Sequence, residues 1–85
     1  MNVQLRFFAS LREALGASAE SVLVPPEVAT VGALREHLRL RGGVWAEALA
    51  GHKVVRIACN QVMVDAAAPL VDGCEVAFFP PVTGG

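Results

Sequence analysis

The sequence predicts an α+β domain in which a single mixed β-sheet of about five strands is covered by one main helix, with short extra helices. Short segments with alternating or unbroken apolar patterns occur near both ends of the chain, and a long helical pattern occurs only in the middle. The predicted order is strand, short helix, strand, long helix and then further short strands. The chain has 85 residues, which is one domain; we place it at residues 1–79, with a tail at 80–85.

The first part of the chain predicts two strands joined by a short helix. Residues 2–8 alternate between apolar and polar side chains, which is typical of a half-buried strand. Ser10 and Glu13 have the spacing of a capping box, so we expect a helix to begin at Ser10 and to stop at Gly16. Residues 20–24 predict the second strand.

The main helix is predicted to follow Thr30, whose hydroxyl can cap it. Val31, Leu34 and Leu38 recur at helical spacing and should form the face that packs across the sheet. The side of this helix that points away from the sheet is expected to carry Arg35, Glu36 and Arg39. The pair Gly42-Gly43 is the expected end of this helix.

The second half of the chain predicts one more helical turn and then three short strands. Trp45 and Leu49 share a face of the turn at residues 44–50. The predicted strands are residues 54–59, 62–64 and 75–79. Asn60-Gln61 and Asp72-Gly73 are the expected turns before the second and third of them.

Composition argues against several classes of function. The net charge is −1, with 7 basic and 8 acidic residues, so a nucleic-acid partner is not expected. No apolar run reaches the roughly 18–20 residues of a membrane span, and the first residues lack a signal-peptide pattern, so we expect a cytoplasmic protein without a membrane partner. The two cysteines, Cys59 and Cys74, have no metal-ligand spacing to His37 or His52, so we expect reduced thiols and no metal site.

The last ten residues are the most informative stretch of the chain. A strongly apolar strand leads into Pro80 and Pro81, which cannot continue a ladder and should hold the chain extended. Gly84 and Gly85 have no side chains, so this end could enter a channel that larger residues would block. We expect a flexible tail whose last group is the Gly85 carboxylate. The chain has no recognisable catalytic grouping, and we do not expect it to be an enzyme on its own.

Residues 75–85, EVAFFPPVTGG, resemble the end of the small, sulfur-carrying subunit of molybdopterin synthase. Residues 3–9 and the Asn60-Gln61 turn are similar to the same family, and the resemblance covers nearly the whole chain. Cys74 departs from it, because we expect a carboxylate there. The resemblance implies that the predicted sheet and helix form a ubiquitin-like β-grasp.

The resemblance also implies a sulfur-carrying cycle. An E1-like activating enzyme would consume ATP to adenylate Gly85, and a sulfur donor, such as a cysteine desulfurase or a rhodanese-type protein, would convert it to a thiocarboxylate. The large subunit of the synthase, which would hold the catalytic pocket, would then receive the tail in a heterotetramer. There the sulfur would pass to a cyclic pterin precursor and form the dithiolene of molybdopterin, in molybdenum cofactor biosynthesis. No permanently bound cofactor is implied.

Each residue of the tail has an implied role in this cycle. Gly85 carries the sulfur and Gly84 provides clearance. The residues expected to line the channel are Thr83, Val82, Pro81 and Pro80. The candidates for the docking surface are Phe78, Phe79, Phe7 and Phe8. Because side chains alternate along a strand, one of Phe78 and Phe79 should face the core, and the sequence leaves open which.

Three other functions stay open at this point. The chain could carry sulfur for thiamine synthesis or for tRNA thiolation, which would use the same fold and the same Gly-Gly end. It could be a ubiquitin-like modifier that is joined through Gly85 to lysines of target proteins. It could also be an interaction module with an inert tail.

Overall fold

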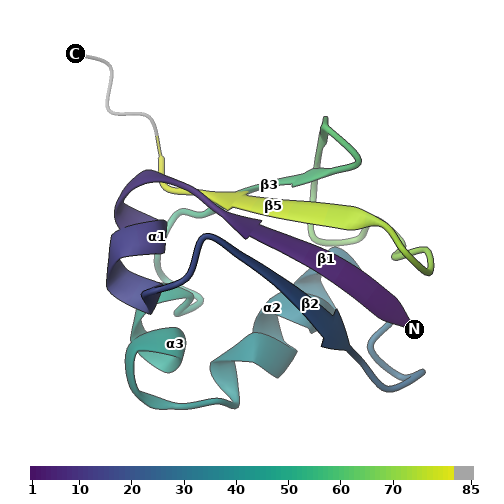
Figure 1. The fold of residues 1–85 in the computed structure, drawn as a ribbon, viewed down its shortest axis with the longest axis horizontal. Helices are drawn as coiled ribbons and strands as arrows, with labels where there is room; N and C mark the ends of the chain where they lie inside the picture. Colours follow the sequence, from purple (N-terminus) through teal and green to yellow (C-terminus); the bar gives the residue numbers. More distant parts are fainter. Residues whose placement is uncertain (82–85) are drawn as a thin grey trace.

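A computed structural model describes residues 1–81, and its elements follow the predicted order (Figure 1). The strands are β1 (Asn2–Phe7), β2 (Ala19–Leu23), β3 (Arg56–Cys59), β4 (Val62–Val64) and β5 (Glu75–Phe79). The helices are α1 (Ala9–Leu15), α2 (Val31–Arg39) and α3 (Gly43–Ala48). The predicted α+β class is confirmed. Residues 82–85, which we expected to form most of the flexible tail, lie outside the described residues.

The last strand lies at the centre of the single mixed sheet, whose order is β2-β1-β5-β3-β4. β5 runs parallel to β1 and antiparallel to β3, and the other pairs are antiparallel. Phe78 is therefore paired with Phe7 on one side and with Ile57 on the other. The tail consequently starts from the strand that is held on both sides, and not from an edge of the sheet (Figure 1).

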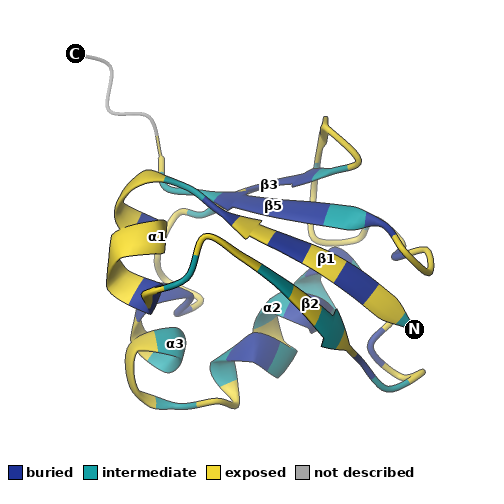
Figure 2. Cartoon of the chain, in the orientation of Figure 1, coloured by how far each residue is buried: buried dark blue, intermediate teal, exposed yellow. Residues whose placement is uncertain are grey.

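The hydrophobic core lies between one face of the sheet and the helices. Buried and exposed residues alternate strictly along β1, so only one of its faces is covered (Figure 2). Val31, Leu34 and Leu38 of α2 are fully buried against that face, as their spacing predicted. Full burial of such a side chain contributes about 1.5–3 kcal/mol. The opposite face of the sheet, which we call the outer face, carries no helix.

The start of α1 differs from the prediction. The helix begins at Ala9, and Phe8 is its cap residue, with extended backbone and no side-chain capping bond. The carbonyl of Phe8 accepts from the amides of Leu11 and Arg12 at 3.1 and 3.4 Å, so Ser10 already lies inside the first turn. A capping side chain must precede the first turn, and the prediction of a capping box at Ser10 is therefore wrong.

The predicted end of the main helix at Gly42-Gly43 is also too late. α2 ends at Arg39. The amides of the next three residues donate to carbonyls three residues back, and the first of these bonds joins Leu40 to His37 at 3.2 Å. Such bonds tighten the last turn and end the helix. Gly42, with φ of 77°, is instead the cap residue of α3. Gly42 thus lies between the two helices, and Gly43 is already the first residue of α3.

β3 is shorter than the predicted segment 54–59 because its neighbour β5 is followed by two prolines. The last pair of the β3–β5 ladder joins Arg56 to Phe79. After β5, the next residue whose N–H would point toward β3 is Pro81, opposite Val54 in this register, and proline has no N–H to donate, so Val54 and Val55 stay outside the ladder. In residues 1–81, no helix has the length and apolar character needed to cross a membrane.

The structure predicts opposite results for two hydroxyl residues near helix starts. Thr30 caps α2, because its Oγ1 accepts from the amide of Ala33 at 3.1 Å. Thr30→Ala should therefore lower the free energy of unfolding by about 1 kcal/mol. Ser10→Ala should change it by less than about 0.5 kcal/mol, since Ser10 caps nothing. Urea unfolding monitored by circular dichroism measures both, and equal losses would contradict this assignment.

Candidate functional site

The alternation along β5 decides which phenylalanines can face a partner. Phe78 has no exposed surface and stacks on Phe7, with ring centres 5.6 Å apart. Phe7 also meets the edge of the partly buried Trp45 ring, with ring centres 5.4 Å apart, so the three rings form one cluster on the core side of the sheet. Phe7 and Phe78 were candidates for the docking surface; the structure corrects this, because both rings are inside the core.

Phe8 and Phe79 form the corresponding pair on the outer face. Their rings are nearly parallel, 6° apart in plane, with centres separated by 4.8 Å. The amide of Phe8 donates to the carbonyl of Phe78 at 3.2 Å, which extends the parallel pairing beyond the end of β1. Both residues are half-buried. Of the four predicted candidates, these two remain available to a partner.

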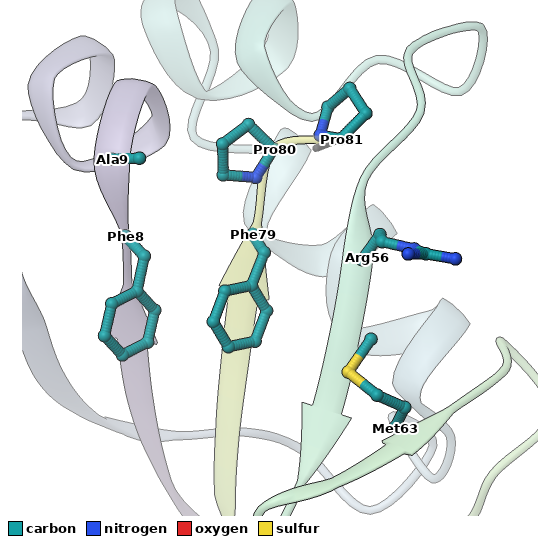
Figure 3. Close-up of a pocket in the computed structure, with 7 residues that line it drawn as sticks. All are labelled: Phe8, Ala9, Arg56, Met63, Phe79, Pro80 and Pro81. Carbon is teal, nitrogen blue, oxygen red and sulfur yellow. The ribbon is translucent and has the colours of Figure 1, made fainter. Parts of the chain in front are cut away.

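A groove of about 480 Å³ lies beside this pair, and we call it the outer groove (Figure 3). Its lining residues are Phe8, Ala9, Arg56, Met63, Phe79, Pro80 and Pro81. The paired residues Ala58 and Ala77 keep the neighbouring part of the outer face hollow, because their side chains are small. The surface is therefore apolar and concave at the point where the tail begins, which suits a hydrophobic partner.

Three residues of the outer groove, Ala9, Arg56 and Met63, were missed by sequence reasoning. Met63 is 56% exposed on β4, and Arg56 pairs with Phe79 across the sheet. The only local signal was a methionine in a predicted short strand and an arginine that interrupts an apolar run. Neither pattern says which strand lies beside β5, so the groove could not be assembled from the sequence.

Two arginines near the outer groove have different surroundings: Arg56 lines the groove itself, whereas Arg6 lines the neighbouring hollow together with Glu75. Arg6 lies 3.8 Å from the Glu75 carboxylate, and its guanidinium carbon lies 5.8 Å from the ring centre of Phe8. Arg56 takes part in no ion pair within residues 1–81. The apolar groove therefore has a cationic rim on the β3 side.

The two prolines mark the point where the described chain leaves the sheet. Pro80 is half-buried, Pro81 is exposed, and both line the outer groove. The tail residues Val82, Thr83, Gly84 and Gly85 lie outside the described residues. Their roles therefore stay predictions.

The cysteines are placed for packing and not for reaction. Burial raises the pKa of the Cys59 thiol, and the neighbouring Cys74 raises it further, so the thiol stays protonated at neutral pH. Cys74 is itself buried in the core. Within residues 1–81 no cluster of three or more potential metal ligands occurs. What these residues provide is a binding surface beside the tail.

Comparison with known proteins places the whole chain among sulfur carriers. The model of the ThiS family matches residues 5–85. The chain is 46% identical over 83 residues to the molybdopterin synthase sulfur carrier subunit of Escherichia coli strain K12, covering 98% of this chain and 99% of that one. Two solved structures have a fold similar to that of this chain, and in both cases the similarity covers all of this chain and all of the solved chain. SAMP1 from Haloferax volcanii is 26% identical with a TM-score of 0.82. Subunit 1 in a complex of subunits 1 and 2 of molybdopterin-converting factor from Helicobacter pylori is 28% identical with a TM-score of 0.69.

The two adjacent phenylalanines of β5 should differ strongly in their effect on stability. Phe78→Ala empties a fully buried site and should lower the free energy of unfolding by about 3–5 kcal/mol. Phe79→Ala should lower it by only about 1 kcal/mol, because its ring is half exposed and loses mainly the stack on Phe8. Chemical denaturation of both variants checks this. A loss at Phe79 as large as that at Phe78 would mean that the outer face is part of the core.

Proposed function

The chain belongs to the ThiS family, and on that premise we propose that it is the sulfur carrier subunit of a molybdopterin synthase. The observation that carries the proposal is the extent of the match. Identity to the Escherichia coli subunit runs along 98% of this chain, and the family match continues through Gly85. The apolar outer groove beside the first tail residues gives independent support, because a carrier must dock before it delivers.

The proposed chemistry takes place at the Gly85 carboxylate. A carboxylate is a poor electrophile, because an oxide leaving group is unfavourable. In the proposed cycle an E1-like enzyme transfers AMP from ATP to this carboxylate and releases pyrophosphate. The persulfide of a sulfur donor, such as a cysteine desulfurase or a rhodanese-type protein, then displaces AMP and forms an acyl disulfide. A thiol reduces the S–S bond of this intermediate and becomes part of a disulfide itself, and the thiocarboxylate that is released is a good nucleophile at neutral pH. We place this cycle in the cytoplasm, and ATP is consumed by the activating enzyme and not held by this chain.

The second half of the cycle requires a partner that holds the pterin precursor. We assign the catalytic pocket to the large subunit, and a complex of two subunits is known for the relative from Helicobacter pylori. Phe8 and Phe79 would dock on that subunit while Pro80 and Pro81 direct the tail into its channel. Two sulfurs are needed for one dithiolene, which fits a heterotetramer with two carriers. Gly84 would give the clearance that the channel requires.

A second function is favoured by one observation, the fold similarity to SAMP1, which belongs to the small archaeal modifier proteins. As a modifier, the chain would be joined through Gly85 to amino groups of other proteins. Its only lysine, Lys53, would then be the single side-chain site for building chains. The two functions differ in their products, because a carrier accumulates a modified terminus and a modifier accumulates conjugates of higher mass.

The mass of the protein isolated from cells tests the proposal. We expect a fraction that is heavier by the exchange of one oxygen for one sulfur, and fragmentation should place the sulfur in the C-terminal peptide. Sulfur found on Cys59 or Cys74 would contradict the carrier mechanism. A ladder of conjugates on other proteins, with no sulfur at Gly85, would favour the modifier.

An alanine appended after Gly85 should leave the fold intact and abolish sulfur transfer. The domain should stay folded, because the tail adds little to the core. The terminal carboxylate would move by up to ~3.5 Å and would sit on a residue with a methyl group. A misplacement of 1 Å can cost about a hundredfold in rate, so sulfur transfer should collapse.

Adenylation by the activating enzyme and product formation by the reconstituted synthase should be measured separately for this variant. An appended glycine is the matched control, because it shifts the carboxylate by the same length without adding a side chain. Normal rates in both assays for the alanine variant would show that the position of the Gly85 carboxylate does not matter.

A further inference from the structure

A second groove lies on the other side of the Pro80-Pro81 segment. It encloses about 420 Å³ between α1, the end of α3 and the loop that precedes β3, and we call it the helix-side groove. Its apolar walls include Leu11, Ala14, Val54, Val55, Pro80 and Pro81. Both prolines also line the outer groove. The start of the tail therefore has an apolar hollow on each side.

The loop before β3 forms one wall of the helix-side groove, and there the side chain of Val54 is largely uncovered. Val54 is 66% exposed, because Pro81, which lies opposite it in the register, has no N–H to continue the ladder and leaves this residue outside β3. A single exposed valine is ordinary on a protein surface. Here it is continuous with the two prolines and with the outer groove, and such continuity is typical of a surface that another protein covers.

The same loop is held in place by Arg35, a residue that we had expected on the side of α2 that points away from the sheet. Its Nε donates to the carbonyl of Leu49 at 2.8 Å. Its Nη2 donates to the carbonyls of Ala50 and Lys53 at 2.6 and 2.8 Å. Charge-assisted bonds of this kind are stronger than neutral ones. The wall that carries Val54 is therefore already in position before a partner arrives, which lowers the entropy cost of binding.

Lys53 gives the helix-side groove a positive rim. It takes part in no ion pair within residues 1–81. Glu47 lines a neighbouring hollow of about 190 Å³ together with Lys53, but the two side chains do not form an ion pair. The ammonium group is thus free to meet a carboxylate of a partner.

We propose that the helix-side groove is a second docking surface for the large subunit of the synthase, which places an apolar side chain beside Val54 and a carboxylate beside Lys53. This inference rests on the proposed function. A subunit that receives the tail in a channel has to surround Pro80 and Pro81, and it then meets both grooves. Contact on both sides prevents rotation about the tail, and sulfur transfer needs such control of position.

Two valines with similar exposure provide the test. Val54→Asp places a carboxylate in the groove, whereas Val71→Asp makes the same change at a residue that is 61% exposed and lies near the turn before β5. We expect Val54→Asp to weaken binding of the full chain to the large subunit at least about tenfold and Val71→Asp to change it less than about twofold. Titration calorimetry measures the affinities, and thermal melting confirms that both variants are folded.

Lys53 variants test the charge. Lys53→Gln should weaken binding about threefold at low salt, and the difference should shrink as salt is raised, because salt screens exposed charges. Lys53→Arg should restore the affinity. Equal binding of Lys53→Gln and the unchanged protein at low salt would overturn the role of this residue.

The outcomes separate the inference from the proposed function. If the unchanged chain does not bind the large subunit, the proposed function is wrong and the inference with it. If the unchanged chain binds and Val54→Asp binds equally well, only the inference is overturned. A variant that binds normally but is adenylated poorly would assign the groove to the activating enzyme, which also overturns the inference.

Discussion

The central position of β5 is the constraint on which the rest of this structure depends. A parallel neighbour and an antiparallel neighbour hold this strand from both sides, and together they hold every residue up to Phe79. A tail that starts from such a strand has a rigid base even though the domain is small. Had the last strand been at an edge, half of these hydrogen bonds would be absent and the base of the tail would shift more easily.

Pro80 and Pro81 together end the central strand β5 and begin the tail. Because proline has no N–H, the ladder with β3 ends at the pair of Arg56 and Phe79, and the loop before β3 turns away from the sheet. Arg35 then holds that loop through three backbone carbonyls. The missing N–H groups of the two prolines thus account both for the end of the strand and for the exposed Val54.

The proposed function asks little of a chain this small. The described residues provide a packed core and two apolar grooves, and the partly buried thiol of Cys59 is kept protonated. The proposed reaction needs only a carboxylate that can be presented to three different proteins in turn. A terminus without side chains on a rigid domain meets that need, because the grooves of the domain bind the partner and the Gly85 carboxylate reacts.

The sequence by itself determined the class of fold, the order of its elements, the buried face of α2 and the cap at Thr30, because these depend on periodicity and on contacts between near neighbours. It also identified Phe78 and Phe79 as an inward and outward pair. Only the tertiary structure decided which is which, because the side that a strand turns to the core depends on the register with β1 and β3, far away in the sequence. The same reason explains the outer groove: Met63 and Arg56 reach Phe79 only through strand pairing, and no local pattern records which strands become neighbours.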